Sequence, residues 1–236
     1  MNTPQTPELV QSAQRILVIG ASRGLGAEFV RQYRADGAEV VATARSDAAL
    51  AVLRGQGVRA LALDVTDPEA VADLARSLEG EAFDVAIVNA GVLLGRASAP
   101  EAPTPTDFDA VMRANVFGPM QLAGVLAPRL VPGGRGVLAV VSSRMGSIGG
   151  RTNGSTWLYR ASKAAVNSVW KDVSFALAGQ AICVSLHPGW VKTDMGGADA
   201  DLSPAESIAA MRATLAGLGP ADNGRFLNYD GSELPW

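Results

Sequence analysis

The sequence is poor in the residues that form disulfides and histidine-rich metal sites. Its 236 residues include one cysteine, Cys183, and one histidine, His187. A disulfide within the chain is excluded, which is typical of proteins from the reducing cytoplasm. The apolar neighbours of Cys183 argue against a catalytic thiol, because no cation is present to lower its pKa. For His187, which ends an apolar run, we expect a structural role in a turn.

Long hydrophobic runs and an excess of basic charge are also missing. No apolar stretch reaches the ~18 residues of a membrane-spanning helix. The net charge of −3 offers no positive field to nucleic acid or to an anionic membrane. Residues 1–14 are polar and contain no basic residue, so we expect a flexible N-terminal tail and no signal peptide. We therefore expect a cytoplasmic protein with no nucleic-acid or membrane partner.

Short apolar runs alternate with segments of helical periodicity from residue 15 onward. The runs are apolar along their whole length, which predicts a parallel sheet covered by helices on both faces. We predict one domain over residues 15–236, an α/β Rossmann-type doubly wound parallel sheet of about seven strands. The expected strands are 15–20, 38–44, 58–63, 85–88, 136–141, 182–186 and 225–228, and the expected helices are 27–36, 67–78, 107–130, 159–178 and 203–216.

A glycine-rich loop follows the first expected strand and leads into a helix. Its glycines have the spacing Gly-x-x-x-Gly-x-Gly. Glycines let the backbone approach a pyrophosphate, and the N-terminus of the helix supplies free N–H groups. The pattern predicts a dinucleotide site formed by Gly20, Ser22, Arg23, Gly24, Leu25 and Gly26.

The end of the second expected strand indicates which dinucleotide binds. An acidic residue there would bind the ribose 2′-hydroxyl of NAD. This chain has Thr43, Ala44 and Arg45 instead, and a second arginine, Arg23, stands in the glycine loop. Two guanidinium groups without a carboxylate suit a 2′-phosphate. We therefore predict NADP(H) as the cofactor.

Two further segments are candidates for cofactor contacts. Asp64 and Val65 end the third strand, where they would hold the adenine, although Asp64 could equally cap the next helix. Asn89, Ala90 and Gly91 follow the fourth strand and allow close approach to a ribose, or form an ordinary tight turn.

Tyr159 and Lys163 are the candidates for chemistry. Their i, i+4 spacing places both side chains on one face of a helix. A cation beside a phenol favours the phenolate and moves its pKa from ~10 toward neutrality. Ser143, preferred to Ser142, would donate to a carbonyl oxygen while the phenol exchanges its proton. Alone, such a pair is more often a solvated helix face.

In their order along the chain, these motifs strongly resemble the short-chain dehydrogenase/reductase superfamily over residues 15–236. Within it, the chain looks most like the C-factor and sniffer-like carbonyl reductase group, which uses NADP(H). The segments that carry this closer resemblance are 115–119, 187–197 and 224–236.

The resemblance implies roles for individual residues. Tyr159 would be the proton donor or acceptor, and Lys163 would hold the nicotinamide ribose and lower the tyrosine pKa. Ser143 would polarise the carbonyl, and Asn115 would position a water between Lys163 and solvent. The residues implied to contact the nicotinamide side are Pro188, Gly189, Val191 and Thr193.

The chain also departs from the family pattern. Ile19 replaces the usual threonine before the first glycine, which removes a hydrogen bond that braces the turn. The spacing from Ser143 to Tyr159 is longer than is common, so residues 146–158 would wall the substrate pocket. Residues 196–202 form a short segment, which predicts a small or absent lid and an open pocket.

Predicted pocket walls are apolar and aromatic with some polar contacts, which suggests a hydrophobic or aromatic aldehyde or ketone as the small-molecule substrate. The expected substrate contacts are Leu93, Arg144, Met145, Trp157 and Trp190.

Other functions and the assembly state stay open. A regulatory or signalling protein that binds NADP(H) with little turnover is the main alternative. Ala44 disfavours an NAD-linked sugar or steroid dehydrogenase, and the short region after Thr193 disfavours a lyase or epimerase. Relatives pair through helices that match residues 107–130 and 159–178, so we expect a homodimer or homotetramer. Trp170 and Phe175 would be interface anchors or core residues.

Overall fold

The computed structural model describes residues 13–236. Within these residues, seven strands form one sheet in the order β3-β2-β1-β4-β5-β6-β7, and every neighbouring pair is parallel. This confirms the predicted fold class. The chain steps from the edge strand β3 back to β4 beside β1, and such a reversal opens a crevice at the carboxyl ends of the strands. The strands are β1 (Arg15–Ile19), β2 (Glu39–Ala44), β3 (Arg59–Ala62), β4 (Val85–Val88), β5 (Val137–Val141), β6 (Ile182–His187) and β7 (Phe226–Asn228).

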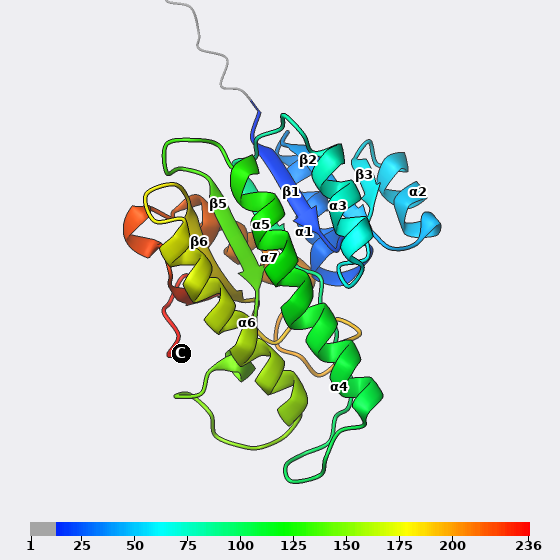
Figure 1. Cartoon of the computed structure of the whole chain (residues 1–236), viewed down its shortest axis with the longest axis vertical. Helices are drawn as coiled ribbons and strands as arrows, with labels where there is room; N and C mark the ends of the chain where they lie inside the picture. Colours follow the sequence, from blue (N-terminus) through cyan, green and yellow to red (C-terminus); the bar gives the residue numbers. More distant parts are fainter. Residues whose placement is uncertain (1–12) are drawn as a thin grey trace, which may run out of the picture.

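Helices cover both faces of the sheet, as predicted, and each face has its own hydrophobic core. In Figure 1, α5 and α6 cross in front of the sheet, and α1 and α7 lie behind it. The rear helices are α1 (Gly24–Ala35), α2 (Asp47–Gly55) and α7 (Pro204–Ala216), and the front helices are α3 (Pro68–Ser77), α4 (Pro105–Met112), α5 (Gly118–Leu126) and α6 (Trp157–Ala176).

Local capping explains most helix boundaries. Asp67 accepts a hydrogen bond from the Glu69 N–H at 2.9 Å and starts α3, as its sequence predicts. A capping box between Ser203 and Glu206 starts α7, also as predicted. Ser46 caps α2. That short helix was missed in the sequence because its amphipathic pattern spans little more than two turns.

The predicted helix over residues 107–130 is interrupted. Between α4 and α5 the chain forms a π-helical turn, Arg113–Phe117, before returning to α-helical geometry. Such turns are rare and often occur at functional sites. Helix α1 begins at Gly24, three residues earlier than predicted, because the second half of the glycine loop is already helical.

Two expectations concern the ends and surfaces of the domain. The predicted N-terminal tail falls mainly on residues 1–12, which lie outside the described residues. The Gln14 carbonyl already accepts the Glu39 N–H at 2.8 Å and so belongs to the sheet. Trp170 is a core residue, 1% exposed, whereas Phe175 is 70% exposed. Within residues 13–236, no helix has the length and hydrophobicity needed to span a membrane.

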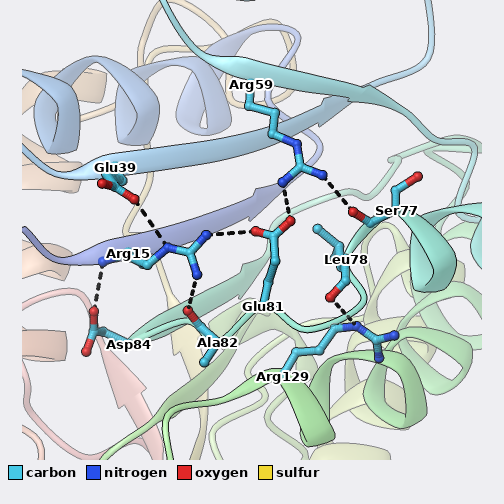
Figure 2. Close-up of polar contacts among 9 residues, drawn as sticks. All are labelled: Arg15, Glu39, Arg59, Ser77, Leu78, Glu81, Ala82, Asp84 and Arg129. Carbon is cyan, nitrogen blue, oxygen red and sulfur yellow. Dashed lines mark hydrogen bonds and ion pairs between the residues drawn. The ribbon is translucent and has the colours of Figure 1, made fainter.

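An ionic network ties together the amino ends of four strands (Figure 2). Arg15 donates to Glu81 at 2.8 Å and to Glu39 at 3.3 Å, and its backbone N–H donates to Asp84 at 2.8 Å. Arg59 pairs with the other oxygen of the Glu81 carboxylate. This network lies at the edge of the sheet opposite the carboxyl ends, so it supports the fold without entering the crevice.

Candidate active site

A cleft opens at the carboxyl edge of the sheet, where the loops after β1, β2, β3 and β4 converge with the segment after β6. It brings together predicted residues from five separate stretches of sequence. Those residues are Gly20, Ser22, Arg23, Gly24, Leu25, Arg45, Asp64, Val65, Asn89, Ala90, Gly91 and Thr193.

Two glycines of the loop are required by packing inside the protein. Gly20 has φ +85°, and a Cβ there would lie 2.8 Å from the Ala90 Cα. A Cβ on Gly26 would lie 2.1 Å from the Gly20 carbonyl oxygen. The absence of side chains therefore lets α1 pack directly against the ends of β1 and β4. The N-terminus of α1 has no side-chain cap, so its first N–H groups are available to an anion in the cleft.

The turn at Gly20 is braced from two neighbouring strands. The Gly20 N–H donates to the Thr43 hydroxyl at 3.0 Å, and Asn89 donates to the Gly20 carbonyl at 2.7 Å. These bonds replace the one that Ile19 cannot make. Asn89 therefore has a structural role whether or not it contacts a ribose. Thr43 was missed as a site residue because its contact depends on the pairing of β1 with β2.

The charged groups of the cleft have distinct partners. Arg45 is exposed, and Arg23 donates from Nη1 to Asp194 Oδ2 at 2.8 Å. Asp64 accepts both the N–H and the hydroxyl of Thr66, at 2.9 and 2.8 Å. Burial opposes its ionisation, but these hydrogen bonds and the nearby Arg45 charge hold the Asp64 pKa below its ordinary value. The helix-cap alternative for Asp64 is wrong, since Asp67 caps α3.

Tyr159 and Lys163 lie on the first turns of α6, and Ser143 follows the end of β5. All three are buried, with exposed fractions of 6%, 5% and 7%. The Ser143 hydroxyl accepts the Met145 N–H at 3.1 Å and lies close enough to the Tyr159 phenol to influence its pKa. Lys163 Nζ lies 5.6 Å from the centre of the Tyr159 ring and donates to the Val141 carbonyl at 2.9 Å. The structure therefore brings the three predicted groups together in one small volume.

The predicted direction of the Tyr159 pKa shift is wrong. Burial raises the pKa of Tyr159 to about 12, and the Ser143 hydrogen bond opposes this only in part. Burial also lowers the pKa of Lys163 to about 8. The ammonium lies over the face of the ring and not at the phenol oxygen, and burial disfavours both charged forms. At neutral pH the phenol is therefore protonated.

Asn115 lies in the π-helical turn and braces the loop after β4. Its Oδ1 accepts the Val92 N–H and its Nδ2 donates to the Val92 carbonyl, both at 2.8 Å. Nδ2 also donates to the Ser162 hydroxyl at 3.0 Å. A Cβ on Gly91 would lie 3.2 Å from Asn115 Oδ1 and 3.6 Å from Lys163 Nζ. The side chain thus has a bracing role, and the water between Asn115 and Lys163 stays a prediction.

Of the four residues predicted on the nicotinamide side, only Thr193 lines the cleft. The Pro188 carbonyl accepts the Ser207 hydroxyl at 2.6 Å. Gly189 has φ +83° and packs against Leu202 and Tyr229. Val191 is buried and forms a bridge with Leu202. These residues shape the turn after β6.

The predicted substrate residues lie after β4, β5 and β6 and at the start of α6, and none of them lines the cleft. Leu93 is half-buried, and Arg144 and Met145 form a short 3-10 turn after Ser143. Trp157 donates to the Glu101 carbonyl at 3.0 Å, and Trp190 to the Gly196 carbonyl at 2.8 Å. They stay predictions.

The expectation of an open pocket with a small or absent lid, based on residues 196–202, stays a prediction. Met195 Sδ lies 3.8 Å from the Tyr159 hydroxyl, and Asp194 reaches Arg23 on the opposite wall. The chain after β6 thus places Met195 beside Tyr159. The cleft residues that sequence reasoning missed are Thr43, Ala44, Leu63, Thr66, Val92, Ala114, Asp194 and Met195. Each of them lies within two residues of a predicted site residue, and this proximity is the signal that could have found them.

Comparison with known proteins identifies the family. The profile described as short chain dehydrogenase matches residues 14–202, well over half of the chain. The chain belongs to the short-chain dehydrogenase family. It is accordingly an oxidoreductase of the dehydrogenase/reductase type, and the similarity to C-factor and sniffer-like proteins is confirmed.

Three similar proteins represent the family. C-signal of Myxococcus xanthus is 40% identical over 154 residues, covering 65% of this chain and 92% of its own. The carbonyl reductase Sniffer of D. melanogaster is 32% identical with a TM-score of 0.86, covering 95% of this chain and 100% of its own. A carbonyl reductase from Pseudomonas aeruginosa PAO1 in complex with NADP is 32% identical with a TM-score of 0.82 and the same coverage.

Proposed function

We propose that this chain is an NADP(H)-dependent carbonyl reductase, which also runs in the alcohol-oxidising direction. The observation that carries the proposal is the gathering of Ser143, Tyr159 and Lys163 in one buried site beside the cleft. A protein that only binds a nucleotide has no need of a phenol, a hydroxyl and an ammonium buried in the same region.

The residues of the cleft fit a phosphorylated dinucleotide. The uncapped N-terminus of α1 suits the pyrophosphate, and Arg23 and Arg45 suit a 2′-phosphate. Asp64 and Val65 would hold the adenine, and Lys163 has two N–H donors left for the nicotinamide ribose after its bond to Val141. When bound, the nicotinamide supplies or accepts a hydride.

Tyr159 handles the proton in this mechanism. Its pKa of about 12 keeps the phenol protonated, which is the form that donates to the oxygen of a carbonyl. Ser143 donates a hydrogen bond to the same oxygen and stabilises its developing negative charge. The Lys163 ammonium stabilises the phenolate left behind, and Asn115 completes the proton path through a water.

The proposed substrate is a hydrophobic or aromatic aldehyde or ketone. The loops around Tyr159 carry the apolar side chains expected to contact it, together with one arginine. The proposed contacts are Leu93, Arg144, Met145, Trp157 and Trp190.

The test measures the absorbance of NADPH or NADH against a panel of aldehydes, ketones and quinones. We expect oxidation of NADPH that falls by orders of magnitude in Tyr159→Phe while NADPH still binds. The matched control is Tyr33→Phe, which removes the hydroxyl of another buried tyrosine on α1 and should keep full turnover. Normal turnover in Tyr159→Phe would exclude the proton-transfer role.

Similarity to C-signal favours a second candidate function, an NADP(H)-binding signalling protein with little or no turnover. The same assay separates the two. Tight NADPH binding without oxidation of the cofactor across the whole panel would favour the signalling function.

We also propose that the chain forms a homodimer or homotetramer in the cytoplasm through α4, α5 and α6. These helices and the π-helical turn between α4 and α5 present large apolar side chains to solvent, including Phe117 at 40%, Met120 at 53% and Phe175 at 70% exposure. Light scattering coupled to size exclusion gives the mass directly. A monomer at micromolar concentration would contradict this assembly.

A further inference from the structure

Residues 193–197 form a compact turn on the wall of the cleft. Gly197 donates its N–H to the Thr193 carbonyl at 2.8 Å, and the Gly196 N–H donates to the Thr193 hydroxyl at 3.2 Å. The Trp190 indole donates to the Gly196 carbonyl at 2.8 Å. These bonds are internal to the turn and to the segment that precedes it, so they hold the turn together as one unit. Its contact with the loop after β4 is an exposed bond from Arg96 to the Met195 carbonyl at 3.2 Å.

This turn lies between Arg23, which lines the cleft, and Tyr159, which lies beside it. At one end, Asp194 Oδ2 pairs with Arg23 Nη1 at 2.8 Å. At the other end, Met195 Sδ lies 3.8 Å from the Tyr159 hydroxyl. The Met195 side chain therefore occupies the position beside the phenol where the carbonyl oxygen of a substrate would accept its hydrogen bond. The arrangement therefore holds the catalytic tyrosine in a covered state while Arg23 is engaged by Asp194.

The ion pair that holds the turn is easily exchanged. The Arg23 and Asp194 side chains are 76% and 77% exposed, and exposed pairs contribute little because water screens them. A phosphate monoester carries more charge than a carboxylate and accepts two parallel N–H bonds from a guanidinium. A 2′-phosphate beside Arg23 would therefore displace Asp194.

We propose that Asp194 is a specificity-determining residue that couples recognition of the 2′-phosphate to access to Tyr159. Capture of Arg23 by the phosphate releases Asp194, and the turn then withdraws Met195 from the phenol. A cofactor without the phosphate leaves the ion pair intact and the tyrosine covered. NADH should therefore give a lower kcat than NADPH, in addition to a higher KM. This inference rests on the proposed function.

Trp190 reports the movement without any turnover. It is 50% exposed and bonded to the turn, so its emission depends on the position of residues 193–197. Two fragments that lack nicotinamide serve as probes, adenosine 2′,5′-bisphosphate and adenosine 5′-monophosphate. We expect the bisphosphate to shift the Trp190 emission and the monophosphate to bind without that shift. A Trp190→Phe variant identifies the signal among the four tryptophans.

Removal of the Asp194 charge supplies the second arm. In Asp194→Asn without any fragment, the Trp190 emission should already have its shifted value. The kcat with NADH should rise about two- to fivefold, the range expected for one exposed ion pair. The matched control is Asp199→Asn, an exposed acid on the same loop, which should change neither. If both bound fragments give the same Trp190 emission, or if kcat with NADH is unchanged in Asp194→Asn, this inference is wrong. Either result would leave the proposed function standing. If neither fragment binds, the proposed cofactor site itself fails, and the inference with it.

Discussion

Replacement of Gly26 by alanine tests the packing of the glycine loop. The added Cβ would lie 2.1 Å from the Gly20 carbonyl oxygen, 2.7 Å from Asn89 Nδ2 and 2.9 Å from the Ala21 Cα. An unstrained carbon–oxygen contact needs ~3.3 Å. Two of these three atoms are backbone, which cannot turn aside, so α1 must move away from β1 by about 1 Å.

The expected cost follows from that displacement. Inserting a methyl group into a tightly packed region costs ~1–3 kcal/mol, and a clash with backbone belongs at the upper end of that range. The movement also stretches the 2.7 Å bond from Asn89 to the Gly20 carbonyl. We therefore expect Gly26→Ala to lose about 3 kcal/mol of unfolding free energy and to bind NADP(H) at least tenfold more weakly.

Urea denaturation gives the stability, and a titration with NADP gives the affinity. Gly55→Ala is the matched control, because Gly55 is also helical and a Cβ there meets nothing within 4 Å. That variant should be unchanged or up to about 0.5 kcal/mol more stable, since alanine favours a helix. If Gly26→Ala stays within 0.5 kcal/mol of the wild type and binds NADP normally, the steric reasoning is wrong.

Three further predictions concern the brace, the network and the histidine. Thr43→Val keeps the shape of the side chain but leaves the Gly20 N–H without its acceptor. Urea denaturation should show a loss of about 1–2 kcal/mol of unfolding free energy, and a titration should show weaker binding of NADP. Glu81→Ala leaves Arg15 and Arg59 without their shared acceptor, so urea denaturation should show a loss of about 2 kcal/mol of unfolding free energy. The kcat should be unchanged, because the network lies far from the cleft. Burial, reinforced by the charge of Arg144, lowers the pKa of His187 to about 3, whereas the unfolded chain protonates this side chain near ~6.5. Below pH 6.5 the unfolded chain therefore binds a proton at His187 and the folded protein does not. The free energy of unfolding should fall by about 2 kcal/mol from pH 6.5 to pH 5. In His187→Leu this fall should be absent, and an identical pH dependence in both proteins would contradict the assignment.

The sequence by itself determined the architecture and most of the cofactor loop. Wholly apolar strands that alternate with amphipathic helices have few solutions other than a doubly wound parallel sheet, because both faces of each strand must be buried. The glycine spacing and the Tyr159–Lys163 spacing are local, so a helix or a turn fixes their geometry before any long-range contact forms.

Only the tertiary structure decided how these local pieces act on one another. The bond from Gly20 to Thr43 exists because β1 pairs with β2 in one particular register. The high pKa of Tyr159 reflects burial by elements far apart in the chain. Arg23 and Asp194 are 171 residues apart and meet only because β1 and β6 end at the same edge of the sheet. Sequence patterns describe neighbours within a few residues, whereas charge, burial and access at this site depend on distances that the completed fold sets.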